Sequence, residues 1–574
     1  MNYIGSYHTG LRLGDCDACD APCTSMGRMS VACADTASSA RGMAMAYGIM
    51  RNRSALARAL NLSHDTSQSQ LVLAAYGRWG EDYALHIQGP CMSCVMDREL
   101  DKLLLTRDRM GECSLFFASR GEGLVFSDHP DSILRTGFIP AVLDRGAACE
   151  LFGLGPARTP GKTFLAGMES LKPGCQLICE GGDLRIRSYF ALSCCEHDED
   201  EHTTVAHTRA LLEQAMDGYV HLHPSTMLSG GLDSTALTAL LCGRIGRVDS
   251  FSVDYADNDR DFVANAYRPE LDAPYIRLAT KHFGTRHRRF VLNQQALAGG
   301  LDAALDMRGF PGMGDIDSSL MLFAGQIALH SHAVISGECG DEVFGGYPWF
   351  RADAPLREEV FPWSGSMALR SAVLRPEIRE KLQIDAYVRD ALRQSVDSYD
   401  LDGIPDGDER RLFCMQRLCF DYFMPNLQER AAKMCDGMGV AVLTPLCDER
   451  LVQYVWNVPW RMKRMGGMEK GLFRAAVADL LPEKLLMRKK SPYPKTCSPI
   501  YANLLRDRMS ALLAEEDAPL WQLCDRDFVS RFNASDLDPS ATPWYGQLMA
   551  GPQLLAYLLQ INSWMRVRDV AVEL

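Results

Sequence analysis

Residues 1–193 show the short-range alternation of apolar and polar positions that half-buried strands produce. The runs KLLLTRD (102–108), SLFFASR (114–120) and GLVFSD (123–128) are each bounded by turn-forming residues. Between residues 175 and 190, two alternating stretches are joined by Gly-Gly-Asp, which is typical of a hairpin. The pattern predicts a first domain built mainly of short strands.

The pattern changes after the segment 194–204, which is rich in carboxylates and poor in apolar side chains. Such a charged stretch is typical of a linker or of a solvated helix start. From residue 205 on, stretches with helical periodicity alternate with short apolar runs such as VDSFSVDY (248–255) and AVISGE (333–338). This alternation predicts βαβ units around a parallel sheet, followed by a largely helical C-terminal part.

Bulk properties narrow the class of protein. A chain of 574 residues exceeds a single hydrophobic core, so we expect two domains, 1–193 and 205–574, joined by a linker at 194–204. The net charge of −13 is the opposite of what a nucleic-acid-binding face requires. The sequence contains neither an apolar run long enough to span a membrane nor an N-terminal secretion signal. We therefore expect a cytoplasmic protein without a membrane or nucleic-acid partner.

The chain has 20 cysteines, many of them inside apolar runs, where a reduced thiol packs as a small hydrophobic group. Cys16, Cys19 and Cys23 are spaced closely enough to begin a zinc site. No paired fourth ligand follows them in the sequence, so a cysteine-rich loop is the favoured interpretation and metal binding stays open.

The strongest chemical signal is the segment 226–237, in which a short apolar strand leads into Ser-Gly-Gly and then into an apolar helix. Glycine lets backbone amides curl around an anion, and Ser229 and Ser234 add hydroxyl donors near the positive helix N-terminus. The loop carries no lysine, which suits pyrophosphate held partly through Mg²⁺, with Asp233 as a metal ligand. For this segment alone, an ordinary helix cap is the alternative interpretation.

A second segment, 334–347, follows the same plan. An apolar strand leads into a glycine-rich turn that carries Glu338, Asp341 and Glu342. Three carboxylates at one strand tip repel one another unless cations lie nearby. Because ligands bind beyond the carboxyl ends of parallel strands, we expect the two loops to enclose ATP and Mg²⁺ between them.

The pair SGGLDS and SGECGDE resembles the ATP-pyrophosphatase loops of asparagine synthetases, in which FGGY follows the second loop as it does here. The resemblance covers nearly the whole chain and includes FSVDYADNDRDF, FPGMGDIDSSLMLF, YVWNVPWRMK, MEKGLFRAA and LMRKKSPYPKT. The two loops alone also fit GMP and NAD synthetases, whereas the later segments are specific to the asparagine synthetase type. The resemblance implies an α/β chain: an N-terminal Ntn-type αββα sandwich, then an ATP-pyrophosphatase domain with a parallel sheet and a helical C-terminal part.

The resemblance also implies roles for individual residues. The pyrophosphate is expected against Ser229, Gly230, Gly231, Asp233 and Ser234. Adenosine is expected against Met227, Val253, Ser336 and Gly337, and Mg²⁺ against Asp233 and Asp341. Glu338 falls beside the reacting carbonyl and amine, and Lys470 matches a lysine that neutralises charge on the phosphates. The amino-acid pocket is expected to border Asp315, Asp317, Ser318 and Ser319.

The implied reaction activates a carboxylate, which by itself has no leaving group. The β-carboxylate of aspartate attacks the α-phosphorus of ATP to give an acyl-adenylate and pyrophosphate, and an amine then displaces AMP. A carboxylate such as Glu338 can accept a proton from the attacking nitrogen. The expected small-molecule substrates are ATP, aspartate and ammonia, and a homodimer is the expected assembly.

The N-terminal region resembles the glutaminase domain of the same family but lacks its reactive residues. That fold uses a cysteine directly after the initiator methionine, where this chain has Asn2. The family's Asn-Gly-Glu is replaced by Tyr47-Gly48-Ile49, and its glutamine-binding Asp by Gln68. Only Arg28 matches a residue of the pocket, the one that binds the glutamine carboxylate. We therefore expect a domain kept as structure, with ammonia taken free or from a separate glutaminase.

Two other functions stay open. β-Lactam synthetases and lasso-peptide cyclases resemble this family, also lack the terminal cysteine, and use a different amine. The family's EVRVPFLD is replaced at 441–448 by AVLTPLCD, which loses a charged pair near the active-site face and favours this alternative. Glu338 argues against it, because β-lactam synthetases have a tyrosine at that position. A non-catalytic regulator is the third possibility, and two complete carboxylate-bearing loops argue against that one.

Overall fold

The computed structural model describes residues 2–9, 23–26, 28–264, 270–351, 360–365, 367–537 and 543–574. The chain divides into two compact units. Unit 1 comprises Met1–Ala147 and Pro160–Ser193, and unit 2 comprises Ala148–Thr159 and Cys194–Leu574. The short segment Ala148–Thr159 groups with unit 2 although it lies between the two parts of unit 1 in the sequence. No helix within the described ranges combines the length and the apolarity needed to cross a membrane.

Unit 1 is built from two six-stranded antiparallel sheets, with the orders β11-β8-β9-β1-β3-β2 and β13-β12-β7-β6-β5-β4. The strands of the first sheet are β1 (Tyr3–Tyr7), β2 (Cys23–Met26), β3 (Met29–Cys33), β8 (Phe116–Arg120), β9 (Gly123–Ser127) and β11 (Glu169–Ser170). Those of the second are β4 (Thr36–Ser38), β5 (Gly42–Gly48), β6 (Cys91–Asp97), β7 (Lys102–Thr106), β12 (Cys175–Glu180) and β13 (Asp183–Ser188).

Alternating side chains from both sheets of unit 1 share one core, which includes Tyr3, Met43, Leu105 and Phe126. The other face of the second sheet is covered by α1 (Arg53–Ala59) and α2 (Gln68–Trp79), whose apolar side chains form a second core against it. A third helix, α3 (Pro130–Arg135), packs on β8 and β9 of the first sheet. These layers confirm the predicted αββα sandwich.

Unit 2 contains a five-stranded parallel sheet in the order β16-β15-β14-β17-β18. Its strands are β14 (Ser225–Met227), β15 (Asp249–Tyr255), β16 (Arg286–Leu292), β17 (Ala333–Ile335) and β18 (Ala441–Leu443). The chain enters at the central strand β14, continues outward to β16, and then returns to β17 on the other side of β14. The carboxyl ends of β14 and β17 therefore form the topological switch point, where ligands of such sheets bind.

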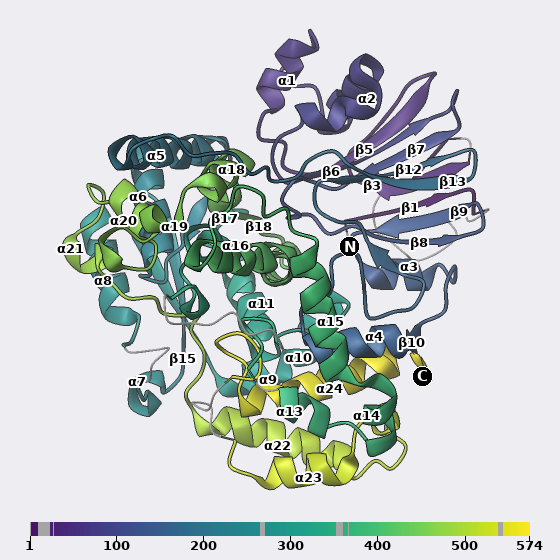
Figure 1. Cartoon of the computed structure of the whole chain (residues 1–574), viewed down its shortest axis with the longest axis vertical. Helices are drawn as coiled ribbons and strands as arrows, with labels where there is room; N and C mark the ends of the chain where they lie inside the picture. The colour runs from purple at the N-terminus through teal and green to yellow at the C-terminus, as the bar shows by residue number, and fades with distance from the viewer. Residues whose placement is uncertain are drawn as a thin grey trace. The chain divides into compact units, whose positions relative to one another are not determined.

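Helices account for most of the rest of unit 2, as the sequence predicts (Figure 1). The longer ones are α5 (Glu201–Asp217), α6 (Leu232–Ile245), α8 (Ala273–Phe283), α10 (Leu301–Arg308), α11 (Asp315–Ala328), α15 (Ile384–Asp397), α16 (Asp408–Leu418), α17 (Met424–Asp436), α18 (Glu449–Asn457), α22 (Pro499–Leu513), α23 (Arg526–Ala534) and α24 (Gly551–Val567). The shorter ones are α7 (Asn258–Asp261), α9 (Gln294–Gly299), α12 (Gly340–Phe344), α13 (Met367–Ala372), α14 (Pro376–Leu382), α19 (Trp460–Lys463), α20 (Gly471–Ala476) and α21 (Glu483–Leu486).

These helices fall into two packed groups. α5 contacts α6, α18 and α20, whereas α11 contacts α10 and α17, and α22 packs on α24. The acidic segment that precedes α5 is irregular up to Asp200, whose side chain caps that helix by accepting a hydrogen bond from the Thr203 amide at 2.8 Å.

Candidate nucleotide-binding active site

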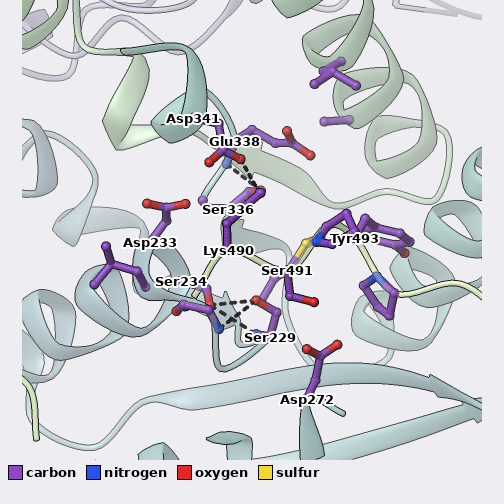
Figure 2. A pocket seen from close by; sticks show the side chains of 18 of the residues that line it. Ser229, Asp233, Ser234, Asp272, Ser336, Glu338, Asp341, Lys490, Ser491 and Tyr493 are labelled. Carbon is purple, nitrogen blue, oxygen red and sulfur yellow. Dashed lines mark hydrogen bonds and ion pairs between the residues drawn. The ribbon is translucent and has the colours of Figure 1, made fainter. Parts of the chain in front are cut away.

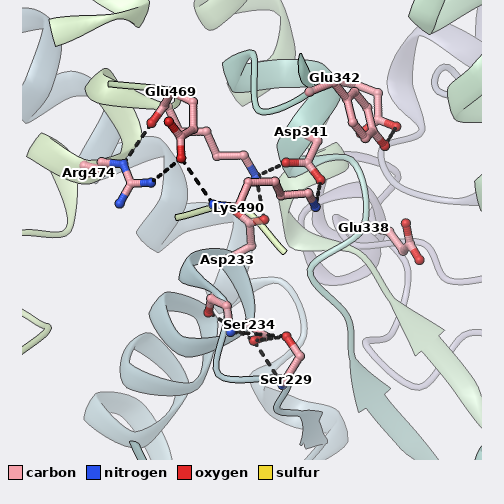
Figure 3. A network of polar contacts seen from close by, with 12 residues as sticks. Ser229, Asp233, Ser234, Glu338, Asp341, Glu342, Glu469, Arg474 and Lys490 are labelled. Carbon is pink, nitrogen blue, oxygen red and sulfur yellow. Dashed lines mark hydrogen bonds and ion pairs between the residues drawn. The ribbon is translucent and has the colours of Figure 1, made fainter. Parts of the chain in front are cut away.

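The first glycine-rich loop follows β14 and leads directly into α6. Gly230 has a φ of 72°, and a Cβ at this position would lie 2.8 Å from the Cβ of Tyr275, so only glycine fits the turn. Within the loop, Ser234 Oγ lies 3.0 Å from Ser229 Oγ and accepts a hydrogen bond from the Ser229 amide at 3.2 Å. The loop thus holds its two hydroxyl groups side by side, as Figures 2 and 3 show.

The second loop emerges beside the first because Ile335, at the end of β17, pairs with Thr226 of β14. Glycines bring this loop into contact with Asp233. A Cβ on Gly337 would lie 3.0 Å from the Cβ of Asp233, and a Cβ on Gly340 would lie 2.9 Å from its Cγ. The two loops that the sequence singled out therefore form one site at the switch point of the sheet.

Lys470 connects the two loops through their carboxylates. Its Nζ lies 2.5 Å from Asp233 Oδ2 and 2.6 Å from Asp341 Oδ1. The residue precedes α20 with a φ of 57°, a left-handed conformation that a non-glycine residue adopts only under constraint from its surroundings. Burial lowers the pKa of Lys470, but Asp233 and Asp341 outweigh burial and raise the pKa overall. The ammonium group is therefore a permanent charge between two strand tips.

Asp341 has a second cationic partner, since Lys490 Nζ contacts its Oδ2 (Figure 3). Burial acts to raise the pKa of Asp341, yet Lys470 and Lys490 together hold that pKa at about 2. The backbone amide of Lys490 donates a hydrogen bond to Glu469 Oε1 at 3.2 Å, which fixes the chain at this point. Asp341 is therefore ionised at every pH at which the protein is expected to work.

The other two carboxylates of the second loop are stabilised in different ways. Glu338 Oε1 accepts a hydrogen bond from Arg430 Nη2 at 2.8 Å. Glu342 is buried and accepts a hydrogen bond from the Tyr347 hydroxyl at 2.8 Å. Burial, followed by the charge of Asp341, raises the pKa of Glu342 to about 8. The three carboxylates therefore do not repel one another strongly. Asp341 is paired with two lysines, Glu338 is paired with an arginine, and Glu342 is protonated near neutral pH.

A cavity of about 210 Å³ opens between the two loops. Of the residues predicted to contact the nucleotide, the metal or the reacting atoms, all but Gly230 line it. The predicted residues in its lining are Met227, Ser229, Gly231, Asp233, Ser234, Val253, Ser336, Gly337, Glu338, Asp341 and Lys470. Residues from motifs that are far apart in the sequence therefore line the same cavity.

The lining also includes charged residues for which the sequence gave no role. Arg430 comes from α17, and the Cζ atom of its guanidinium group lies over the Tyr493 ring, 5.1 Å from the ring centre. Arg488 donates a hydrogen bond to the Ser229 carbonyl at 3.2 Å, and Lys490 is two residues further on. Together, six lysines and arginines face five aspartates and glutamates in the lining, an excess of positive charge that suits an anion. The basic run RKK at 488–490 was the only sequence signal for these residues.

Residues 315–319 belong to the segment that the resemblance placed at the border of the amino-acid pocket, and they lie behind the cavity lining. Asp315, Asp317, Ser318 and Ser319 are all absent from its lining. Asp317 instead pairs with Arg308, Nη1 to Oδ2 at 3.1 Å, and Ser319 Oγ lies 3.1 Å from the Tyr493 hydroxyl. These polar side chains support the cavity wall from behind, whereas the same segment reaches the lining through Met313, Leu320 and Phe323.

The segment 441–448, where AVLTPLCD replaces the family's EVRVPFLD, begins on β18. This strand lies at the edge of the parallel sheet, beside β17. Side chains alternate along a strand, and here Val442 lines the cavity whereas Ala441 and Leu443 do not. The lost charged pair corresponds to Ala441 and Leu443, the two neighbours of Val442 on this strand, so the departure lies directly beside a residue of the cavity lining.

In unit 1, Asn2 stands at the start of β1 and is held by side chains around it. Its Nδ2 donates to the Tyr47 hydroxyl at 2.7 Å and to Asp128 Oδ2 at 3.2 Å. Gln68 is held as well, because its Oε1 accepts from the Met50 amide at 2.6 Å and its Nε2 donates to the Gly48 carbonyl at 3.0 Å. Two of the replaced positions thus serve as polar cross-links of the sandwich.

Arg28 does not belong to the same site. The Arg28 carbonyl accepts a hydrogen bond from the His8 amide, at the opposite end of β1 from Asn2. The five residues of β1 separate His8 from Asn2, and the six residue steps between them correspond to about 20 Å. The Arg28 side chain is exposed and pairs with Asp101 at 3.4 Å. The prediction that Arg28 survives from a glutamine pocket at Asn2 was wrong.

The cysteine cluster cannot be followed, because Cys16 and Cys19 lie outside the described residues. Cys23 is exposed. Among the residues that the structure describes, no three His, Cys, Asp or Glu side chains converge in a way that would hold a metal ion.

Glu342 makes the stability of unit 2 depend on pH. Its folded pKa of about 8 lies above the ordinary value, so its contribution to stability is complete in acid and is lost as the pH rises towards 8. The slope is at most about 1.4 kcal/mol per pH unit. Glu342→Gln imitates the protonated acid, so we expect its advantage in stability over wild type to be larger at pH 8 than at pH 5, by about 1 kcal/mol or more.

Denaturant unfolding between pH 5 and 8.5 measures this difference. Glu516→Gln makes the same chemical change at an exposed position and should follow the wild-type profile. Parallel profiles for wild type and Glu342→Gln would show that Glu342 is ionised in the folded protein.

Comparison with known proteins identifies the family to which the chain belongs. The family described as asparagine synthase matches residues 207–566, and the glutamine amidotransferase domain matches residues 36–190. Glutamine-hydrolyzing asparagine synthetase 3 of Bacillus subtilis (strain 168) is 36% identical over 519 residues, which is 88% of this chain and 84% of that protein. Glutamine-hydrolyzing asparagine synthetase B of Escherichia coli (strain K12) is 26% identical over 315 residues, 51% of this chain and 49% of that protein.

A solved structure of glutamine phosphoribosylpyrophosphate amidotransferase from B. subtilis covers 46% of this chain and 51% of its own, with 11% identity and a TM-score of 0.21. That likeness is too low to support an argument. The family match over more than half of the chain, together with a relative aligned over most of both sequences, is sufficient. The chain belongs to the asparagine synthase family of ATP-dependent, AMP-forming ligases.

Proposed function

We propose that this chain adenylates the β-carboxylate of aspartate with ATP and then forms an amide with ammonia, releasing AMP and pyrophosphate. One observation supports this above all: Asp233 and Asp341, from two neighbouring strand tips, converge on one cation in a cavity that Glu338 also lines. Carboxylates that meet at a cation beside a glycine-rich loop suit a metal-bound polyphosphate.

The residues present fit Mg²⁺, which takes oxygen ligands. Asp233 and Asp341 converge closely enough to contact a single Nζ, and Asp233 Oδ1 is buried without a hydrogen-bond donor among the described residues. We propose that these two carboxylates hold Mg²⁺ together with the nucleotide. When bound, the metal neutralises charge on the pyrophosphate leaving group.

The remaining contacts of the nucleotide follow from the lining of the cavity. The first loop, which lines the cavity with the hydroxyl-bearing Ser229 and Ser234, is proposed to hold the pyrophosphate. Met227, Val253, Ser336 and Gly337 supply the surface for adenosine. Gly230 keeps the turn tight enough for the amides to approach the phosphates.

Two charged residues are proposed to act on the reacting atoms. Lys470 neutralises the negative charge that develops on the phosphates when the carboxylate attacks the α-phosphorus. Glu338 accepts a proton from the nitrogen that attacks the adenylate. Arg430 is a positioning residue, because its Nη2 donates a hydrogen bond to Glu338 Oε1 at 2.8 Å and so orients that carboxylate.

The nitrogen is proposed to come from free ammonia or from a separate glutaminase. Asn2 has no thiol, and its amide is already bonded to Tyr47 and Asp128. Gln68 is bonded at both ends of its amide to the backbone of residues 48 and 50 and is not free to bind glutamine. Unit 1 is therefore proposed to be structural.

A second candidate function is supported by the apolar part of the cavity lining. Leu427, Ala431, Cys435 and Val442 give the cavity an uncharged wall, which a larger amine would cover and ammonia would leave empty. The alternative is therefore an adenylating ligase whose acceptor is an organic amine, as in β-lactam synthetases or lasso-peptide cyclases. The nitrogen assay described below separates the two functions.

With aspartate, Mg²⁺ and ammonium, the protein should convert ATP into AMP and pyrophosphate in equal amounts. Asp341→Asn should reduce the rate by at least about 100-fold, because it removes a proposed metal ligand and a partner of Lys470. Asp397→Asn makes the same chemical change on an exposed part of α15 and should retain the wild-type rate. Nucleotides and pyrophosphate are followed by chromatography and a coupled assay. ADP as the nucleotide product would overturn the mechanism.

Gly346 leaves room for the ion pair. A Cβ there would lie 2.0 Å from Asp341 Oδ1 and 2.2 Å from Lys470 Cε, so Gly346→Ala must displace one partner. We expect kcat/KM for pyrophosphate release to fall by about 100-fold with little change in the unfolding midpoint. Gly243→Ala, on α6 with no atom within 4 Å of its new Cβ, is the matched control and should be fully active. An active Gly346→Ala enzyme would show that this ion pair is not required.

The protein should form no glutamate from glutamine at any pH, and it should form asparagine from aspartate, ATP, Mg²⁺ and ammonium. The rate should rise through the neutral pH range, because only unprotonated ammonia attacks the adenylate. Amino-acid analysis measures both products. Pyrophosphate release that requires an organic amine, or that ignores aspartate, would favour the second candidate. Release of glutamate at a rate comparable to amide formation would refute the proposed loss in unit 1.

A further inference from the structure

Asp341 carries two lysine counter-ions, and the chemistry proposed above uses only one of them. Lys470 is shared between Asp233 and Asp341, whereas the one carboxylate paired with Lys490 among the described residues is Asp341, through Oδ2. The Lys490 side chain is 24% exposed and lines the cavity. Its backbone is tied to Glu469 Oε1 by the amide hydrogen bond. The ammonium group can therefore move to a new partner in the cavity while the chain that carries it stays in place.

The same two carboxylates are occupied by ammonium groups at the place proposed for Mg²⁺. A divalent cation on Asp341 would lie within a few ångströms of Lys490 Nζ, and like charges at that distance repel strongly outside bulk water. Asp233 and Asp341 also do not amount to a complete metal site, because no third ligating side chain converges on them among the described residues. Without a nucleotide, the protein therefore has too few ligands for the metal and too much positive charge near its site.

A bound polyphosphate would supply both the ligands that the metal lacks and the negative charge that balances the lysines. Its oxygens add ligands for the metal, and its negative charges give lysine a new partner. The excess of cations over carboxylates in the cavity lining is consistent with a site that is balanced only when an anion is present. Lys490 is the cation best placed for this exchange, because it is partly exposed and has one carboxylate partner, whereas Lys470 is buried between two.

We propose that Lys490 is an exchangeable counter-ion: it neutralises Asp341 in the nucleotide-free protein and transfers to the phosphates when the metal–nucleotide complex binds. Lys490 thereby keeps the metal out until the nucleotide enters. No covalent bond changes, and one oxyanion simply replaces another beside the ammonium group. This inference rests on the proposed function for the identity of the ligand.

Mn²⁺ binding, measured by electron paramagnetic resonance of the free ion, tests the proposal without turnover. Wild-type protein should bind Mn²⁺ weakly when the ion is alone and much more tightly with α,β-methylene-ATP. Lys490→Gln should bind Mn²⁺ alone at least about tenfold more tightly than wild type, because one repelling charge is gone. The same variant should bind the nucleotide about tenfold more weakly, because a phosphate contact is lost. Lys490→Arg keeps the charge and should resemble wild type.

Lys489→Gln is the matched control, since it removes the same charge from the neighbouring, exposed residue of the cavity lining. It should change Mn²⁺ affinity by less than about twofold, because an exposed charge is screened by solvent. Adding Asp341→Asn to Lys490→Gln should abolish the gain in Mn²⁺ affinity. Unfolding curves establish that each variant is folded.

Three outcomes would overturn the proposal: Lys490→Gln without a gain in Mn²⁺ affinity, an equal gain for Lys489→Gln, or wild-type protein that binds Mn²⁺ alone as tightly as with nucleotide. The last outcome needs no variant, so the proposal stays falsifiable if Lys490→Gln does not fold. Failure of the proposed function is separate, because it would appear as the wrong nucleotide product or the wrong acceptor in the turnover assays.

Discussion

The site depends on one shared ammonium group. Asp233 and Asp341 belong to loops 108 positions apart in the chain, and the two loops bring one partly buried and one buried negative charge to the same edge of the sheet. Burying an unpaired carboxylate is unfavourable, so a cation between the two strand tips reduces the repulsion between their charges. Lys470, 3% exposed and held in a left-handed backbone conformation, supplies that cation. The glycines on either side follow from the same requirement, because a Cβ at Gly340 or Gly346 would enter the space of the ion pair.

The sequence predicted the elements of this site well where the signal was local. SGGLDS and SGECGDE each combine a strand, glycines and carboxylates within a few residues, so their backbone geometry and chemistry are largely decided within the segment itself. The parallel sheet and the αββα sandwich followed for a similar reason, since the alternation of apolar positions is a short-range property. These were the parts of the fold and site that could be predicted.

Other features depend on which segments meet in space, and the sequence pattern did not contain that information. Arg430 and Lys490 approach the second loop from segments roughly 90 and 150 residues away, where an arginine or lysine is ordinarily a surface residue. Asp317 carries a charge typical of a binding site, yet its partner Arg308 faces it inside the protein. Glu342 is protonated near neutral pH only because it is buried next to Asp341. Arg28 was misplaced because a motif match gives no register, and the register of β1 with β3 puts it at the far end.

The bonds of Gln68 have a consequence for protein engineering. In this sandwich the side-chain amide of Gln68 makes the hydrogen bonds that a neighbouring strand would make. Its Nε2 donates to the Gly48 carbonyl, and its Oε1 accepts from the Met50 amide. A carboxylate at this position has only acceptors to offer, so it would leave the Gly48 carbonyl unpaired and facing negative charge. Reintroducing a cysteine at position 2 alone would therefore give a thiol without a pocket. A designer who sought to rebuild the pocket would first have to find another way to hold the end of β5 to the start of α2.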